Sequence, residues 1–298
     1  MSAAAAAELV NQWVELMRRS EALTVDIGGV FAEQIIHHFT EQALGRGLPG
    51  VTVPPPRNEQ LEREIRFTGQ DAAVRRLWQQ HRIVYSIDPD LWAELGDSED
   101  SQVIPGGLFT RLPHPDPFIA FPEPLVVPLD DQQQVRMRGF FVTGRDDVGH
   151  CTTANPATDG NLMLLFGGEV ESLQGKPVMA APGLQDIIWN RCTLQNDKDR
   201  TLIAHHSAIA SRFQHGTGKS YGGRFDATVV PALRRAMSLL VYLCATNAEL
   251  RPLPARPAGK SRGKGAPKPP KVVAVGYQTG AVLRAHRRSA SVGPALVL

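Results

Sequence analysis

The chain has 298 residues, of which 42% are apolar and 21% are charged, so it is long enough to bury one large core or two moderate ones. This composition excludes a disordered chain, and no apolar run approaches the roughly 18 to 20 residues that cross a bilayer. The N-terminal stretch MSAAAAAELV carries no basic segment ahead of its apolar residues, which argues against a signal peptide. We therefore expect a cytoplasmic protein with no membrane contact.

Charge is distributed unevenly along the sequence. Ten of the 32 Lys and Arg residues follow Glu249, and no acidic residue follows it. The first 249 residues thus hold the other 22 basic side chains against 30 acidic ones, a net charge of −8, whereas the remainder carries +10. Such a tail is predicted to contact phosphate or an acidic surface, its own body included; a solvated basic linker is the alternative. The predicted nucleic-acid contacts are Lys260, Arg262, Lys264, Lys268 and Lys271.

Residues 1–80 are predicted to form a helical N-terminal region. Apolar residues recur at helical spacing in two stripes, which are Leu9, Trp13, Leu16 and Met17, then Val30, Ile35, Ile36 and Phe39. A proline connector at 48–56 separates them from a further helix, for which Thr68 and Asp71 are candidate caps.

Residues 81–250 are predicted to form an α+β core domain. The alternating stretch RIVYSI at 82–87 indicates a strand, and a helix should follow it, with Asp88 as N-cap and Pro89 as first residue. Further candidate strands lie at 108–112, 118–121, 135–144 and 161–168. Helices are predicted again at 184–192, 199–213 and 231–250. We expect a mostly antiparallel sheet with helices packed on one face.

The last part of the chain is predicted to be a linker, residues 251–270, and a closing strand and helix, residues 271–298. The linker is rich in proline, glycine and basic residues and has no hydrophobic pattern. Gly276 and Gly280 lie four residues apart, which lets the closing helix approach another element closely. The predicted fold class is therefore α+β, with N-terminal helices, a central mostly antiparallel sheet, a C-terminal core helix and a strand–helix closure.

No residue pattern in the sequence predicts catalysis, a metal site or a cofactor. The stretch HGTGKSYGG at 215–223 resembles a phosphate loop, but Phe213 stands where that loop needs glycine. His205 and His206 are adjacent and would point about 100° apart on a helix, so they do not readily bind one ion together. The three cysteines, Cys151, Cys192 and Cys244, are odd in number and widely spaced, which favours free or buried thiols over a disulfide framework. We expect a protein that is not an enzyme; a nuclease or transferase with an unrecognised site is the alternative.

The stretch LPHPDPFIAFPEP at 112–124 surrounds a short apolar strand, Phe118–Phe121, with five prolines. Because proline lacks a backbone donor, it is confined to the edges and ends of sheets. We therefore predict an edge strand that pairs with an extended peptide, with Phe118 or Phe121 lining a side-chain pocket. The alternative is a protected edge with no ligand.

Three blocks of the sequence resemble, in their order and spacing, the anti-CRISPR family of type V-A, second variant. They are RIVYSIDPDLWAEL leading to GGLFTRLPHPDPFIAFPEP, then LRRAMSLLVYLCATNAEL, and, after the basic linker, VVAVGYQTGAVLRAHRR. The matching positions are Tyr85, Asp88, Leu112, Tyr242, Gly276, Gly280 and Arg284. The stretch at 175–219 departs from the family pattern.

The resemblance implies a phage or plasmid accessory protein that inhibits host defence without catalysis. It would bind a peptide of a CRISPR effector nuclease, as a nascent chain, and lower the production of that nuclease. The predicted peptide contacts are Tyr85, Asp88, Leu112, Phe118, Phe121, Arg138, Tyr242 and Arg284. The basic tail would associate with RNA or the ribosome. An accessory protein that only binds nucleic acid is the alternative.

Overall fold

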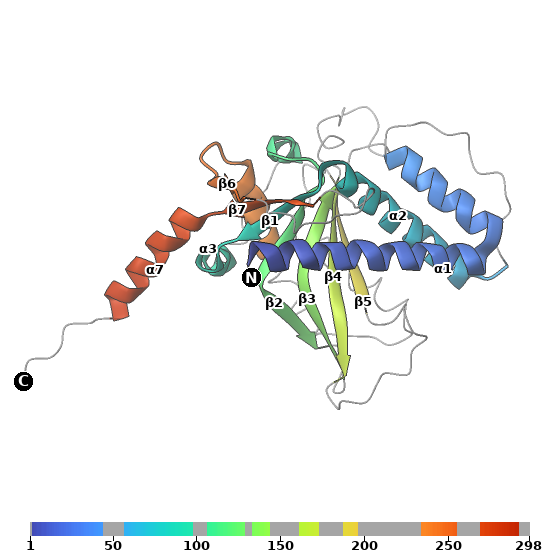
Figure 1. The fold of residues 1–298 in the computed structure, drawn as a ribbon, viewed down its shortest axis with the longest axis horizontal. Coiled ribbons are helices and arrows are strands. Elements are labelled where there is room, and N and C mark those ends of the chain that lie inside the picture. Colours follow the sequence, from blue (N-terminus) through green and yellow to red (C-terminus); the bar gives the residue numbers. More distant parts are fainter. Residues whose placement is uncertain are drawn as a thin grey trace, which may run out of the picture.

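A seven-stranded mixed sheet forms the centre of the molecule, with helices against it (Figure 1). The computed structural model describes residues 2–43, 57–97, 106–128, 133–143, 161–172, 187–195, 234–254 and 269–291. The helices are α1 (Ala3–Ala43), α2 (Glu59–His81), α3 (Pro89–Glu94), residues 234–244 and α7 (Tyr277–Ser291), with short 3₁₀ helices η1 (Leu95–Asp97) and η2 (Gly106–Arg111). The strands are β1 (Ile83–Ile87), β2 (Phe118–Pro128), β3 (Gln133–Thr143), β4 (Asn161–Ser172), β5 (Ile187–Gln195), β6 (Leu250–Pro252) and β7 (Lys271–Val275).

The strand order is β5-β4-β3-β2-β1-β7-β6. β1 is parallel to both of its neighbours, β2 and β7, and the other four pairings are antiparallel. The predicted α+β class with a mostly antiparallel sheet is therefore confirmed, as are the N-terminal helices and the closing strand and helix. Among the described residues, no helix is both long enough and apolar enough to cross a membrane.

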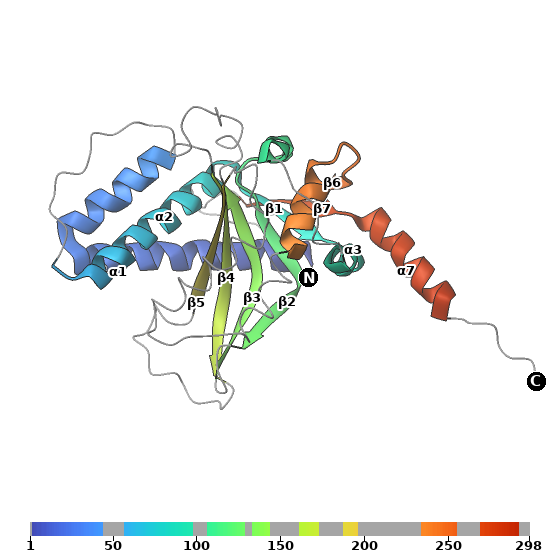
Figure 2. The same cartoon turned by 180° about the vertical axis from the view of Figure 1, so that it is seen from behind.

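Helices cover both faces of the sheet, so the prediction of a single covered face is wrong (Figure 2). Successive side chains of a strand point to opposite faces, and β1 is buried along its whole length. Val84 packs with Trp13 of α1 and Trp78 of α2, while Tyr85 packs on the other face in the cluster that contains Leu240 of the 234–244 helix. A strand that is apolar on both faces needs two helical layers.

The N-terminal helices form a hairpin that extends beyond the sheet (Figure 1). α1 bends at Gly29, whose φ of 57° and ψ of −145° interrupt the helix, and the second half turns back along α2. There Phe31, Ile35 and Ile65 make a small apolar cluster of their own. Thr68 and Asp71 are not the caps that were predicted, because α2 starts well before them, at Glu59. Thr68 is instead buried within the helix, and its hydroxyl lies 3.1 Å from the hydroxyl of Thr24 in α1.

The proline-flanked segment is an interior strand, which contradicts the predicted edge strand. Phe118 pairs with Val84 of β1 on one side and with Phe141 of β3 on the other. Two of the prolines, Pro122 and Pro124, fall where the β2–β3 register shifts between Ala120 and Leu125. Prolines are tolerated at such irregularities as well as at edges, and sequence alone did not distinguish the two.

Three other segments differ from their predicted structure. Residues 108–112 lie largely in η2 and form no strand. Of the helix predicted at 184–192, the described residues 187–192 belong to strand β5 instead. The helix predicted at 231–250 ends at residue 244, because the chain turns and enters β6 to pair with β7. In each case pairing or packing with distant residues outweighs a weak local preference. The segments 48–56, 145–160 and 199–230 lie outside the described residues.

Candidate functional site at the junction of α3 and α7

Most of the positions that match the three resembling sequence blocks lie where two parallel strands end. β1 and β7 are neighbours that finish at Ile87 and Val275, and each is followed at once by a helix, α3 or α7. The backbone N–H of Asp88 donates to the carbonyl of Val275 at 3.0 Å, which joins the two strand ends. The first turn of α3 and the start of α7 therefore lie side by side.

Asp88 is a buried N-cap. Its side chain accepts a hydrogen bond from the backbone N–H of Asp90 at 2.9 Å, and Pro89 follows as the first helical residue. Both roles were predicted from the sequence and are confirmed. Only 1% of the Asp88 side chain is exposed, so its carboxylate needs a charged partner.

Arg284 of α7 is that partner. Its Nη1 donates to both carboxylate oxygens of Asp88, at 3.1 and 3.0 Å, and to Asp90 at 2.6 Å. The hydrogen bonds to Asp88 and then Asp90 raise the pKa of Arg284 above its usual value, so it stays charged. One turn later Arg287 pairs with Asp90 at 2.7 Å and with Glu94 at 3.1 Å. Two of the ten positive charges of the tail thus bind the acidic body of the same chain.

Two glycines allow α7 to lie this close to α3. Gly276 has a φ of 71°, a left-handed conformation, and a Cβ there would collide with the side chain of Leu91. A Cβ at Gly280 would collide with the carboxylate of Asp88. The predicted close approach at these two positions is confirmed.

Replacing Gly280 with alanine tests this contact, because helix propensity and close packing change the free energy of unfolding in opposite directions. Helix propensity alone would stabilise the protein by about 1 kcal/mol. Because the added methyl group meets a buried carboxylate, we expect destabilisation by about 2 kcal/mol instead. Urea denaturation measures it, with Ser289→Ala on the same helix as the control: Ser289 is exposed, and the substitution removes only its hydroxyl hydrogen bond to the carbonyl of Ala285 within the helix. A stabilised Gly280→Ala protein would contradict the close packing of α3 and α7.

Glu249 caps the start of α7 and connects Tyr242 to the same junction by a hydrogen bond. Its carboxylate accepts hydrogen bonds from the backbone N–H of Gln278, at 2.7 Å, and of Thr279, at 3.1 Å. A carboxylate is favoured at a helix N-terminus. The Tyr242 hydroxyl in turn accepts the backbone N–H of Glu249 at 3.2 Å. This role of Glu249 was not predicted, because the residue falls within the helix expected at 231–250.

The remaining predicted contacts near the sheet are buried. The hydroxyl of Tyr85 lies 2.6 Å from Nδ1 of His114, and the rest of the Tyr85 side chain is in the core with Leu112. Phe118 meets Trp13 edge-on, with ring centroids 5.3 Å apart, and Phe121 lies 4.8 Å from Trp92 on the opposite face. Their burial leaves neither phenylalanine to line a pocket at the surface.

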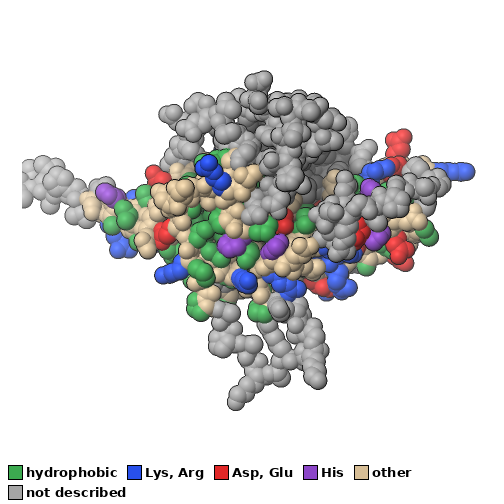
Figure 3. All heavy atoms as spheres, turned by 90° about the horizontal axis from the view of Figure 1, so that it is seen from above, with side chains coloured by type: hydrophobic (Ala, Val, Ile, Leu, Met, Phe, Trp, Pro, Cys, Tyr) green, Lys and Arg blue, Asp and Glu red, His purple; other side chains and the backbone are tan. Residues whose placement is uncertain are grey.

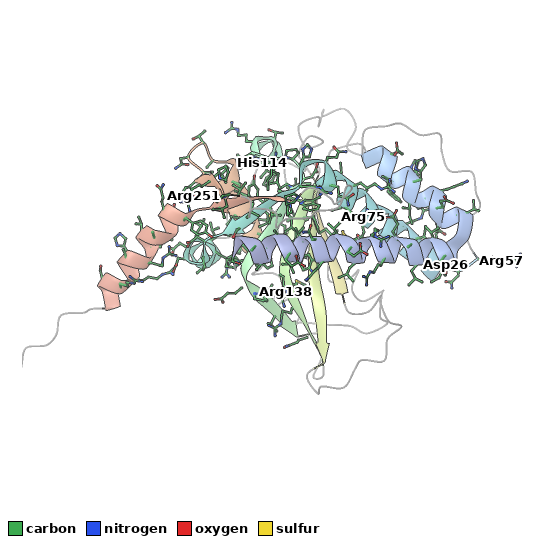
Figure 4. The ribbon with its side chains drawn as sticks, viewed as in Figure 1. Asp26, Arg57, Arg75, His114, Arg138 and Arg251 are labelled. Atoms are coloured by element: carbon green, nitrogen blue, oxygen red, sulfur yellow. The ribbon has the colours of Figure 1, made fainter. Side chains whose placement is uncertain are left out.

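Besides Arg284, the two predicted basic contacts that the structure describes, Arg138 and Lys271, lie on different strands. Arg138 is half-buried on β3, below α1 in Figure 4, and Lys271 is exposed at the start of β7. The surface seen from above mixes basic and acidic side chains along its described part (Figure 3). The predicted contacts that lie outside the described residues are Lys260, Arg262, Lys264 and Lys268. The structure therefore brings together Asp88, Arg284 and, through Glu249, Tyr242, and it places Arg138 on another element.

Comparison of this chain with known proteins identifies the family to which it belongs. A solved structure entitled "Crystal structure of AcrVA2" has 10% sequence identity and a TM-score of 0.49, over 93% of this chain and 90% of that one. No curated protein sequence matches the chain. The model of the AcrVA2-like family, described as "Anti-CRISPR type V subtype A2 family", matches residues 85–295, which run from β1 to beyond α7 and contain the whole junction. The chain therefore belongs to the anti-CRISPR type V subtype A2 family.

Proposed function

We propose that this anti-CRISPR protein binds a peptide segment of a CRISPR effector nuclease, as a nascent chain in the host cytoplasm, and thereby lowers the production of that nuclease without catalysis. Family membership carries the proposal. The matched region starts in β1 and ends beyond α7, and these distant segments are joined by strand pairing and by the Asp88–Arg284 ion pair. The unit matched by the family model is thus one structural body around the sheet.

A binding role, as opposed to catalysis, is supported by the structural roles of the charged side chains at the junction of α3 and α7. Asp88 caps α3 and pairs with Arg284, and Glu249 caps α7. A general base needs a carboxylate within reach of a substrate proton, whereas the carboxylate of Asp88 is buried against α7. The junction fixes the direction of α7 relative to the sheet.

Burial also reduces the number of residues that we propose as peptide contacts. Five of the eight predicted residues are almost fully buried, which fits a supporting role: Tyr85, Asp88, Leu112, Phe118 and Phe121. The three that keep exposed surface, and which we propose as contacts, are Arg138, Tyr242 and Arg284.

Cys244 provides a test of the alternative in which the protein is an enzyme. Burial raises the pKa of this thiol to about 11, so it stays protonated and unreactive at neutral pH. In a Cys151→Ser, Cys192→Ser variant, where it is the sole cysteine, we expect no iodoacetamide labelling of folded protein at pH 8. The same variant unfolded in urea should label fully. Labelling of the folded protein faster than the unfolded control would reveal an activated nucleophile, and labelling at the same rate would contradict the burial of the thiol.

Co-expression tests the proposed function. A cell that produces the effector nuclease together with this protein should contain less nuclease and less of its message than a cell with the effector alone. An unrelated protein expressed from the same promoter is the control and should keep its level. Unchanged effector protein would overturn the proposal. Degradation of RNA or modification of the nuclease by the purified chain alone would establish an enzyme instead.

Association with RNA through the basic tail is a second part of the proposal. Lys271 is exposed at the start of β7, directly after the linker, and an accessory nucleic-acid-binding protein would use the same charges. Because phosphate contacts release counterions, RNA binding should weaken steeply between low and physiological salt. Titration of labelled RNA at several salt concentrations measures it, and affinity independent of salt would contradict phosphate binding.

A further inference from the structure

Three arginines line one face of α7. Arg284, Arg287 and Arg288 are spaced three and four residues apart, which places their side chains next to one another on a helix. Both ribbon views show α7 extending outward from the sheet beside α3 (Figures 1 and 2). The sequence of α7, YQTGAVLRAHRRSAS, contains no acidic residue. The negative charges that face these arginines therefore come from another element.

That element is α3, and the burial of its carboxylates decreases along the helix. Asp88 is 1% exposed, Asp90 is 19% exposed and Glu94 is 53% exposed. Arg284 pairs with the first two of these, at 3.0 and 2.6 Å. Arg287, which is 48% exposed, pairs with the last two, at 2.7 and 3.1 Å. Since ion pairs between exposed side chains are weak and screened by salt, another anion can replace Glu94 on Arg287.

We propose that Arg287, with Arg288 beside it, binds phosphate groups of RNA. In the isolated protein, Asp90 and Glu94 occupy Arg287 and compete with the phosphate. This inference rests on the RNA association proposed above and adds a contact to it, because the basic residues predicted for that role all precede α7. A guanidinium binds phosphate through the same parallel N–H groups that bind a carboxylate, so phosphate oxygens fit the position that Glu94 occupies.

The charge distribution favours RNA over an acidic peptide as the ligand. The chain after Glu249 contains ten basic residues and no acidic one. Lys271 is exposed at the start of β7, and a single residue, Gly276, separates β7 from α7. A polyanion contacts several such charges at once and releases a counterion at each, whereas one peptide carboxylate replaces only one carboxylate of α3. A continuous strand of phosphates therefore matches this part of the chain better.

The inner ion pair should keep α7 in place while the outer one is exchanged. Nη1 of Arg284 donates to both carboxylate oxygens of Asp88, at 3.1 and 3.0 Å, and Gly280 packs against the same carboxylate. Breaking a buried pair leaves an uncompensated charge, so this contact should persist when RNA binds. RNA then needs to displace only the exposed pair.

Titration of labelled single-stranded RNA into the full-length protein tests the contact. At about 0.1 M salt, Arg287→Gln should lower the affinity about fivefold and reduce the slope of log affinity against log salt by about 0.7, as expected for the loss of one phosphate contact. Unchanged affinity and slope would overturn the inference and leave the RNA association of the wild-type protein standing. Absence of RNA binding by the wild-type protein would refute the association itself, and the inference with it.

A double-mutant cycle tests the competition. Glu94→Gln removes a competing carboxylate and should raise the RNA affinity about twofold. Glu33→Gln, at an exposed position of α1, removes the same charge and should have a smaller effect. In an Arg287→Gln background, Glu94→Gln should raise the affinity no more than Glu33→Gln does, because Glu94 acts through Arg287.

Two outcomes of these titrations would contradict the competition or its ligand. Equal gains from Glu94→Gln and Glu33→Gln in the wild-type background would show that only net charge matters. A peptide of the effector nuclease whose affinity falls in Arg287→Gln, while the RNA affinity does not change, would assign the site to a protein ligand and overturn the inference.

Discussion

Replacing Phe118 with alanine is expected to lower the free energy of unfolding by about 4 kcal/mol, because the side chain is fully buried in the centre of the sheet. Its ring lies 5.3 Å from that of Trp13 and 4.9 Å from that of Phe141. The substitution leaves a cavity between α1 and β3 that these rings cannot fill. Urea denaturation followed by tryptophan fluorescence measures the loss.

Two variants make the Phe118 prediction specific. Phe118→Leu keeps most of the volume and should cost about 1.5 kcal/mol, which gives a measurable value if the alanine variant does not fold. Val126→Ala changes an exposed side chain of the same strand, 40% exposed, and should cost less than about 1 kcal/mol. An alanine variant as stable as wild type would mean that Phe118 lies at the surface.

Replacing Asp88 with alanine is expected to destabilise the protein by about 3 kcal/mol. About 1 kcal/mol comes from loss of the N-cap of α3, and about 2 kcal/mol from loss of the charge-assisted hydrogen bonds to Arg284. Since α7 is held mainly through α3, trypsin should then cleave after Arg284 or Arg287 more rapidly than in wild type. Denaturation and timed proteolysis measure the two effects.

A pair of controls separates the two roles of Asp88. Asn is a good N-cap without a charge, so Asp88→Asn should retain α3 and lose only the ion-pair part. Glu94→Ala breaks an ion pair whose side chains are 48% and 53% exposed, and it should change stability by less than about 0.5 kcal/mol. Equal effects of Asp88→Ala and Glu94→Ala would show that burial of the Asp88 carboxylate does not matter.

The junction of α3 and α7 was partly predictable. Asp88 and Pro89 form a cap signal within two residues, and Gly276 and Gly280 indicate close packing by their type and spacing. What they pack against was not predictable, because Arg284 lies 196 residues from Asp88 and the tail holds ten basic residues that could serve equally well. The pairing follows from the parallel arrangement of β1 and β7, which no local pattern encodes.

By itself the sequence determined those features that depend on neighbours in the chain: the strands at β1, β3, β4 and β7, the cap of α3, and the helices of both ends. Only the tertiary structure decided that Phe118–Phe121 is interior, that both faces of the sheet are covered, and that β5 and β6 are the outermost of the described strands. The physical reason is that an apolar alternating segment fits many partners equally well. Its place in a sheet is chosen by the summed burial and hydrogen bonding of the whole chain.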